Sequence, residues 1–126
     1  PEGDAYACSS IEGRVAIDLV EETAQEQKFA FKCHRQPIPG QTERETVYPV
    51  NAMAIHPTFT TCFATGGGDG IVQLWDRKLR RRLKQWPKYR TSISSLAFNR
   101  DGQALAIAAS YGYEEGEKDH VPDSIF

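Results

Sequence analysis

The sequence has no long hydrophobic run. None of its segments approaches the roughly 20 consecutive apolar residues that a membrane-spanning helix needs, and no secretory signal opens the chain. We therefore expect no membrane partner. The 126 residues also lack an initiator methionine and end without a polar tail. This predicts that the chain is a piece of a longer protein.

Cysteine is scarce. Cys8, Cys33 and Cys62 are an odd number of thiols, and none belongs to a Cys-x-x-Cys pair. The spacing argues against a disulfide framework and against a zinc site. Each cysteine follows or precedes small or apolar residues in a predicted strand, as buried reduced thiols do. We expect a reducing compartment, no bound metal and no cofactor.

A strong excess of either charge is also missing. The net charge is −2, so the chain as a whole is not a nucleic-acid binder by charge, and nucleic acid is not an expected partner. The exception is the segment 77–90, which carries eight Lys or Arg residues and no acid. These cations suit phosphate groups or an acidic partner. The same cations also suit a solvated outer strand, where their charges prevent pairing with the edge of another sheet. We favour this second interpretation.

Catalytic patterns are absent from the sequence. His56 and His120 have no nucleophile at a recognisable spacing, and no carboxylate lies in an apolar pattern that would raise its pKa. The glycines of 66–70 lack the Gly-Lys-Ser/Thr of a phosphate-binding loop. The sequence therefore predicts a protein that is not an enzyme.

The strongest pattern present is the stretch 65–76, Thr-Gly-Gly-Gly-Asp-Gly-Ile-Val-Gln-Leu-Trp-Asp. Asp69-Gly70 is a tight-hairpin dipeptide, because glycine adopts positive φ freely and aspartate tolerates it. The apolar run that follows predicts a buried strand. A strand that ends in Trp-Asp is typical of the repeat that builds β-propeller blades.

Internal repetition supports the same fold. Residues 106–112 align with residues 64–70 at an offset of 42 positions, inside the ~40–45 residue period of propeller blades. Residues 7–17 align with residues 64–74 at a longer offset, 57 positions. We assign the excess to an insertion near 36–47, which is rich in Pro, Gly and charge and is predicted to be a loop.

Alternation and turn residues give a strand map. We predict the end of one blade in 1–35, an inserted loop in 36–49, a complete blade in 50–90, and the start of another in 91–126 with an acidic loop at 111–122. The expected strands are 4–9, 14–20, 28–35, 50–55, 62–66, 71–76, 80–86, 93–98, 104–109 and 124–126. The predicted class is an all-β propeller fragment of about two and a half blades.

The stretch 65–76 resembles the WD-repeat family, whose propellers close with roughly 4–8 blades. Since this fragment holds fewer blades than that, the resemblance implies that it packs against the remaining blades of the same propeller. We expect about seven blades in total. The resemblance also implies a hydrogen-bonded tetrad of Trp, Ser or Thr, His and Asp that locks a blade. Its places here are filled by Trp75, Thr65, His34 and Asp69. His34 is separated from its blade by the predicted insertion.

More specific segments narrow the resemblance. They are Ser-Ile-Glu-Gly-Arg-Val-Ala at 10–16, Phe-Ala-Phe-Lys-Cys-His-Arg at 29–35, Tyr-Pro-Val-Asn-Ala at 48–52 and Thr-Ser-Ile-Ser-Ser-Leu-Ala-Phe at 91–98. Together they are similar to the carboxy-terminal blades of the WD-repeat spindle-checkpoint family, the third "budding uninhibited by benzimidazole" family. A sister family, the messenger-RNA export factors of the nuclear pore, shares part of this pattern and remains the alternative.

The resemblance implies a scaffold in the nucleus, and at the kinetochore in mitosis. In the checkpoint family, arginines in the Gly-Arg-Val-Ala and Cys-His-Arg stretches face an acidic peptide motif of checkpoint kinases. The same surface receives phosphorylated Met-Glu-Leu-Thr repeats of the kinetochore scaffold. The matching residues here are Arg14 and Arg35, and we add Lys32 as a neighbouring cation.

Overall fold

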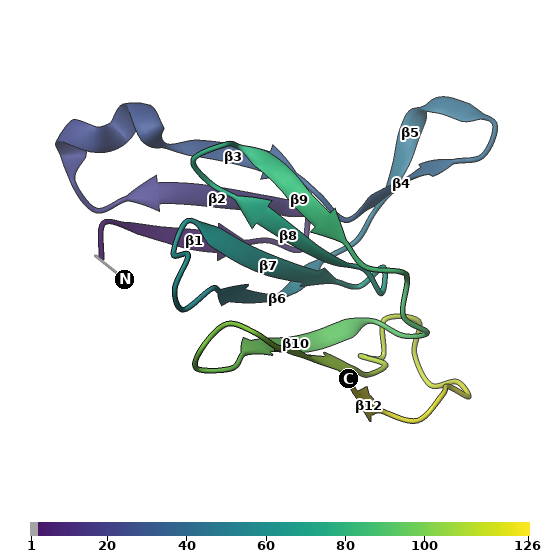
Figure 1. Cartoon of the computed structure of the whole chain (residues 1–126). Helices are drawn as coiled ribbons and strands as arrows, with labels where there is room; N and C mark the ends of the chain where they lie inside the picture. The colour runs from purple at the N-terminus through teal and green to yellow at the C-terminus, as the bar shows by residue number, and fades with distance from the viewer. Residues whose placement is uncertain (1–2) are drawn as a thin grey trace.

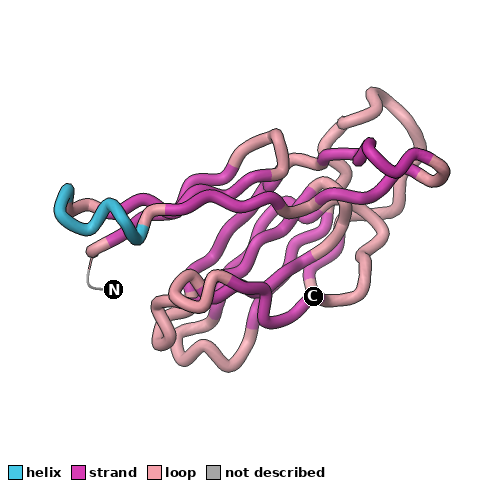
Figure 2. The backbone as a smooth tube through the Cα atoms, turned by 90° about the horizontal axis from the view of Figure 1, so that it is seen from above, coloured by secondary structure: helices cyan, strands magenta, loops and turns pink. Residues whose placement is uncertain are grey.

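The computed structural model describes residues 3–126, and strands dominate it (Figure 1). The helical part of the described chain is a short 3-10 helix, η1 (Glu22–Gln27), which projects from one end of the molecule (Figure 2). No helix within residues 3–126 is long and apolar enough to cross a membrane. The all-β prediction is confirmed.

A four-stranded antiparallel sheet forms the centre. Its strands are paired in chain order as β6 (Val50–Ile55), β7 (Cys62–Gly67), β8 (Val72–Asp76) and β9 (Arg81–Gln85). Strand β7 is buried on both faces, which its small residues permit. At Gly66, for example, a Cβ atom would lie only 2.3 Å from a side-chain carbon of Ile93 in the next sheet.

Smaller sheets flank the central one (Figure 1). The first contains β1 (Ala5–Ser9), β2 (Arg14–Leu19) and β3 (Phe29–Lys32), and the last contains β10 (Ile93–Phe98), β11 (Leu105–Ala109) and β12 (Ser124–Ile125). Strand β6 lies beside both β1 and β10. The three sheets are therefore arranged as neighbouring blades.

Each face of the central sheet packs against one neighbour. Ala64, Val72, Ile93 and Ile107 belong to a core shared with the last sheet. A second core joins the central sheet to the first one and contains Val15, Ile17, Cys33, Val50 and Phe63. The alternation of apolar residues along β2 and β8 decides which side chains enter which core.

The segment 36–49 is not the loop that its composition predicts. Strands β4 (Arg35–Ile38) and β5 (Gln41–Val47) pair into a hairpin that projects from the sheets, with its turn at Gly40, where φ is +77° (Figure 1). All seven residues of β5 are exposed, so the segment has no apolar alternation to mark it as a strand. The domain boundaries themselves stay a prediction.

Strand β3 is also shorter than the expected 28–35. It ends at Lys32, and His34 adopts a φ of +51°, which breaks the extended conformation. The other strands lie within one or two residues of their predicted ranges.

Candidate functional site

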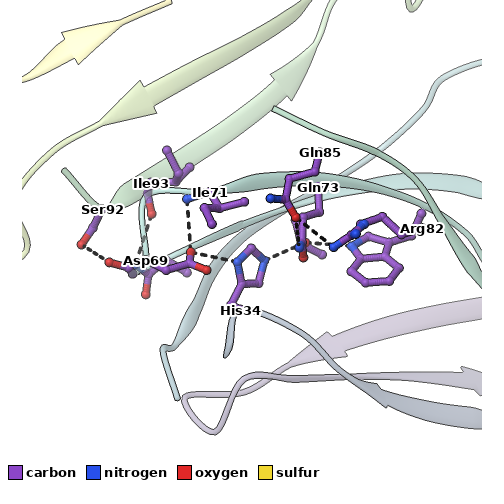
Figure 3. Close-up of polar contacts among 12 residues, drawn as sticks. His34, Asp69, Ile71, Gln73, Arg82, Gln85, Ser92 and Ile93 are labelled. Atoms are coloured by element: carbon purple, nitrogen blue, oxygen red, sulfur yellow. Dashed lines mark hydrogen bonds and ion pairs between the residues drawn. The ribbon is translucent and has the colours of Figure 1, made fainter. Parts of the chain in front are cut away.

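The structure brings the four predicted tetrad residues into one hydrogen-bonded chain. His34 Nδ1 lies 2.9 Å from Asp69 Oδ1, and His34 Nε2 lies 2.8 Å from Thr65 Oγ1. Figure 3 shows the His34 ring pointing toward Asp69. The indole Nε1–H of Trp75 donates to the same Thr65 oxygen at 3.0 Å. His34, Thr65 and Asp69 are buried, with exposed fractions of 3% or less.

The donors and acceptors of the tetrad run in one direction. Thr65 Oγ1 accepts from Trp75, so its own hydroxyl hydrogen is free for His34 Nε2, and His34 Nδ1–H then donates to Asp69. The amide of Ile71 donates to the same Asp69 oxygen at 3.1 Å (Figure 3). With this neutral tautomer of His34, each of these polar hydrogens has an acceptor. The network is therefore complete, which is the condition for a buried network to stabilise a fold.

The backbone around His34 is shaped to admit its ring. Gly67 leaves the space in which a Cβ atom would lie 2.4 Å from His34 Nδ1. In the residue before His34, the Cys33 amide donates to the carbonyl of Gly13 at 2.9 Å. Burial raises the pKa of the Cys33 thiol to about 12, so this cysteine is a protonated packing group. The segment 33–34 therefore joins the turn of the first sheet to the central sheet.

A pair of cations, Arg14 and Lys32, lies at the end of the first sheet that adjoins the segment 33–34. Arg14 begins β2, Lys32 ends β3, and the two are directly opposite in the antiparallel register. Both are exposed, and within residues 3–126 neither has an ion-pair partner. Opposite residues on antiparallel strands have Cβ atoms roughly 4.5–5.5 Å apart, and like charges there repel. An anion placed between Arg14 and Lys32 would relieve this repulsion.

Arg35 reaches the same end but points largely inward. Its Nη2 donates to the carbonyl of Glu12 at 2.7 Å, and its Nη1 lies 3.8 Å from Glu45 Oε2. The side chain is 16% exposed, and its Nε is buried without a hydrogen-bond partner among the described residues. The structure thus brings Arg35 near the other two cations, while part of its guanidinium already holds the β1–β2 turn.

Sequence reasoning missed an open cleft on the neighbouring loops. It has a volume of about 590 Å³, and its lining includes Tyr48, Asp69, Arg90, Tyr111 and Glu114. Glu114 accepts a hydrogen bond from the buried Ser92 hydroxyl, which ties the acidic loop to the start of β10. Four separate loops form this cleft, so only one of them, the acidic loop at 111–122, was visible in the sequence. Over the described part of the chain, no group of three or more His, Cys, Asp or Glu residues could hold a metal ion.

Comparisons with known proteins identify relatives of the chain. The WD40 family profile, "WD domain, G-beta repeat", matches residues 27–76. Over the whole chain, the sequence is 55% identical to the mitotic checkpoint protein BUB3.1 of Arabidopsis thaliana, of which it covers 36%. It is 50% identical over 99% of the chain to the mitotic checkpoint protein bub3 of Dictyostelium discoideum, covering 37% of that protein.

A second group of relatives consists of proteins named for RNA export. The chain is 41% identical over 91% of its length to the poly(A)+ RNA export protein of Schizosaccharomyces pombe, of which it covers 32%. The chain therefore spans about a third of the length of the curated relatives that it matches. The blade-like sheets, the tetrad geometry and these matches agree on the fold. The profile match identifies a WD40 repeat in residues 27–76, and the relatives of the chain include mitotic checkpoint proteins and RNA export proteins.

Proposed function

We propose that the protein is a non-catalytic scaffold of the mitotic checkpoint that binds short acidic or phosphorylated peptide motifs. The observation that carries this proposal is the Arg14–Lys32 pair, two exposed cations opposite each other with no acid to neutralise them among the described residues. The mitotic checkpoint names of several relatives support the cellular role.

The chemistry of the pair suits such ligands. The guanidinium of Arg14 offers a planar fork to a carboxylate or phosphate, and Lys32 adds a flexible point charge. A phosphothreonine carries a charge of about −1.5 to −2 at neutral pH, more than one carboxylate. Because the adjoining segment 33–34 is held by the buried tetrad, little ordering of the surface is needed when a ligand binds.

The proposed partners follow from this chemistry and from the family resemblance. They are an acidic peptide motif of checkpoint kinases and phosphorylated Met-Glu-Leu-Thr repeats of the kinetochore scaffold. The proposed location is the nucleus, with the kinetochore as the site of action in mitosis. Arg14 and Lys32 contact the ligand in this proposal, and Arg35 contributes mainly by holding the turn beside them.

The second candidate is a role in RNA export. It is favoured by the relatives named poly(A)+ RNA export protein and mRNA export factor, both 41% identical to this chain. In that role the protein binds a nucleoporin peptide, and binding does not depend on phosphothreonine.

A peptide titration on the full-length protein tests the proposal. Phosphorylated and unphosphorylated Met-Glu-Leu-Thr peptides are titrated against the wild type and an Arg14→Ala/Lys32→Ala variant. We expect tighter binding of the phosphopeptide, and about a tenfold or greater loss in the variant, because hydrogen bonds to charged groups contribute about 1.5–3 kcal/mol each.

The control, matched to the Arg14→Ala half of the variant, is Arg100→Ala. This change also removes one exposed positive charge, but from the β10–β11 turn, which lies beside His56 at the opposite end of the sheets. It should leave the affinity unchanged. Equal and weak binding by all proteins and both peptides would reject the checkpoint site and favour the export role.

A further inference from the structure

A second surface lies between the first and central sheets, on the side where β3 and β9 are the outer strands. A small cavity of about 80 Å³ opens here, and its walls include Phe29, Phe31, Phe63 and Trp75. The rings of Phe31 and Trp75 are in contact, with centroids 4.5 Å apart. We call this cavity the inter-blade groove. It is apolar at its base because aromatic side chains of both sheets meet there.

Arg77, Arg80 and Arg81 line the groove, Arg82 is the next residue of β9, and their contacts differ. Arg77 forms an ion pair with Asp4 at 2.9 Å, and Arg80 places its guanidinium 4.8 Å from the centroid of the Phe29 ring. Arg81 has no carboxylate partner in the described chain, and Arg82 donates only to the neutral Gln85 side chain at 2.8 Å. The lining also contains one acid, Asp76, against the four cations Lys32, Arg77, Arg80 and Arg81, so positive charge remains at the rim.

Strand β9 adds an open backbone edge. It is the last strand of the central sheet, it pairs with β8 on one side, and all five of its residues are exposed. An unpaired edge can accept another strand, and a row of cations prevents a second copy of β9 from being that strand. An extended peptide with negative charge would not be repelled by these cations.

The groove is too small for a cofactor. Pockets for small molecules are about 300–1,000 Å³, whereas about 80 Å³ holds a single apolar side chain. Nucleic acid is also a poor match, because the aromatic residues next to the basic strand are already covered. Lys84 lies over the ring of Trp86, and the ring of Tyr89 packs against Phe126. Stacking of bases on these rings would compete with the contacts that they already make.

We propose that β9 and the inter-blade groove bind an extended acidic peptide that carries one apolar anchor residue. The anchor enters the groove, the flanking carboxylates pair with Arg81 and Arg82, and the peptide main chain lies along the open edge of β9. This surface goes beyond the proposed function, since it uses the groove and the edge of β9 in place of the Arg14–Lys32 pair. Lys32 borders both surfaces and is therefore left unchanged in the test.

The test is fluorescence anisotropy on the full-length protein with a labelled peptide, Asp-Glu-Asp-Leu-Asp-Glu-Asp. The variants are Arg81→Glu/Arg82→Glu and, as a control with the same charge change, Arg90→Glu/Arg100→Glu. We expect about a tenfold or greater weakening for the first variant and no more than a twofold change for the control. Replacing the central leucine of the peptide by glycine should also weaken binding, and bound peptide should slow hydrogen exchange in residues 81–85.

Three outcomes would overturn the proposal. The first is equal weakening by both pairs of substitutions, which indicates only general attraction between charges. The second is unchanged binding when the leucine is removed, which shows that the groove takes no anchor. The third is displacement of the peptide by an oligouridylate RNA at lower concentration than by unlabelled peptide, which assigns β9 to nucleic acid. Thermal melting of each variant, expected within a few degrees of wild type, confirms that the fold is intact.

Discussion

His34 is the residue on which the polar interior of the central sheet depends. It is 2% exposed and joins Thr65 to Asp69 through its two ring nitrogens. Removing it leaves a hydroxyl and a carboxylate buried without their partner, and each such group costs about 1–3 kcal/mol, more when it is charged. We therefore predict that His34→Ala lowers the free energy of unfolding by about 3 kcal/mol or more, measured by denaturant titration.

The control for this prediction is His120→Ala. His120 is exposed in the acidic loop, its Nδ1 contacts the carbonyl of the adjacent Val121, and its ring centroid lies 5.1 Å from that of Tyr111. Surface substitutions of this kind usually change stability by less than about 0.5 kcal/mol. If the two variants were equally stable, the buried hydrogen-bond chain would not be a major source of stability.

The sequence, together with the family resemblance, was sufficient to name the four residues of the tetrad. Thr65, Asp69 and Trp75 lie within twelve residues of one hairpin, and the family resemblance implied that they meet. The resemblance also implied His34, although the β4–β5 hairpin separates it from the other three. The inward turn of Arg35 had no sequence signal, since it depends on a backbone carbonyl of Glu12 and a carboxylate of Glu45 from other elements.

Among the elements, the β7–β8 hairpin is the most tightly constrained. Gly70 has a φ of +75°, and a Cβ atom there would lie 2.8 Å from the carbonyl oxygen of Tyr89 and 2.9 Å from that of Thr91. Both obstacles are backbone atoms, which cannot move without shifting the start of the next blade. The turn and the connection to β10 are therefore packed as one unit.

Gly70→Ala and Gly40→Ala form a matched pair that separates packing from backbone strain. Both glycines have nearly the same positive φ, and a left-handed conformation costs an L-residue about 1–2 kcal/mol. At Gly40 no atom lies within 4 Å of the added Cβ. We predict that Gly70→Ala is more destabilising than Gly40→Ala by about 1–3 kcal/mol, the usual cost of overpacking, in thermal or denaturant unfolding. Equal losses would show that strain alone matters at Gly70.

Strand prediction succeeded where one face of a strand is buried. The apolar alternation of β2 and the Trp-Asp ending of β8 both correspond to side chains that enter a core. It failed for β5, whose seven residues are all exposed, and it gave no sign of η1, which has no buried residue. Periodicity reports burial, so it missed these two elements. Strand β9 is also fully exposed, but it was expected as the fourth strand of the predicted blade in 50–90.

At the scale of the whole molecule, Asp4 and Arg77 connect the first sheet to the central one across 73 positions of the chain. Arg77 Nη2 donates to both carboxylate oxygens, at 3.2 and 2.9 Å. Its hydrogen bonding lowers the pKa of Asp4 below the usual 3.8. Because the pKa is lower in the folded than in the unfolded state, the contribution to stability is present above about pH 4 and is lost as the pH falls through the folded value.

We predict a small, pH-dependent effect of Asp4→Asn, since Asp4 is exposed to solvent. The melting temperature of the variant should lie below that of the wild type at pH 7, and the difference should vanish as the pH falls to about 3. The ion pair of Lys28 with Asp18 titrates in both proteins and cancels from the comparison. A difference that stayed constant from pH 7 to pH 3 would mean that the carboxylate charge of Asp4 has no role.

The β4–β5 hairpin has one more consequence. Its tip at Gly40 has open space around it, and β5 contributes no buried residue to either core. Lengthening such a tip costs only loop entropy, about 0.6 kcal/mol for each doubling of its length. The hairpin is thus a place where sequence length can vary between species, or where a reporter can be inserted, without disturbing the blades that it connects.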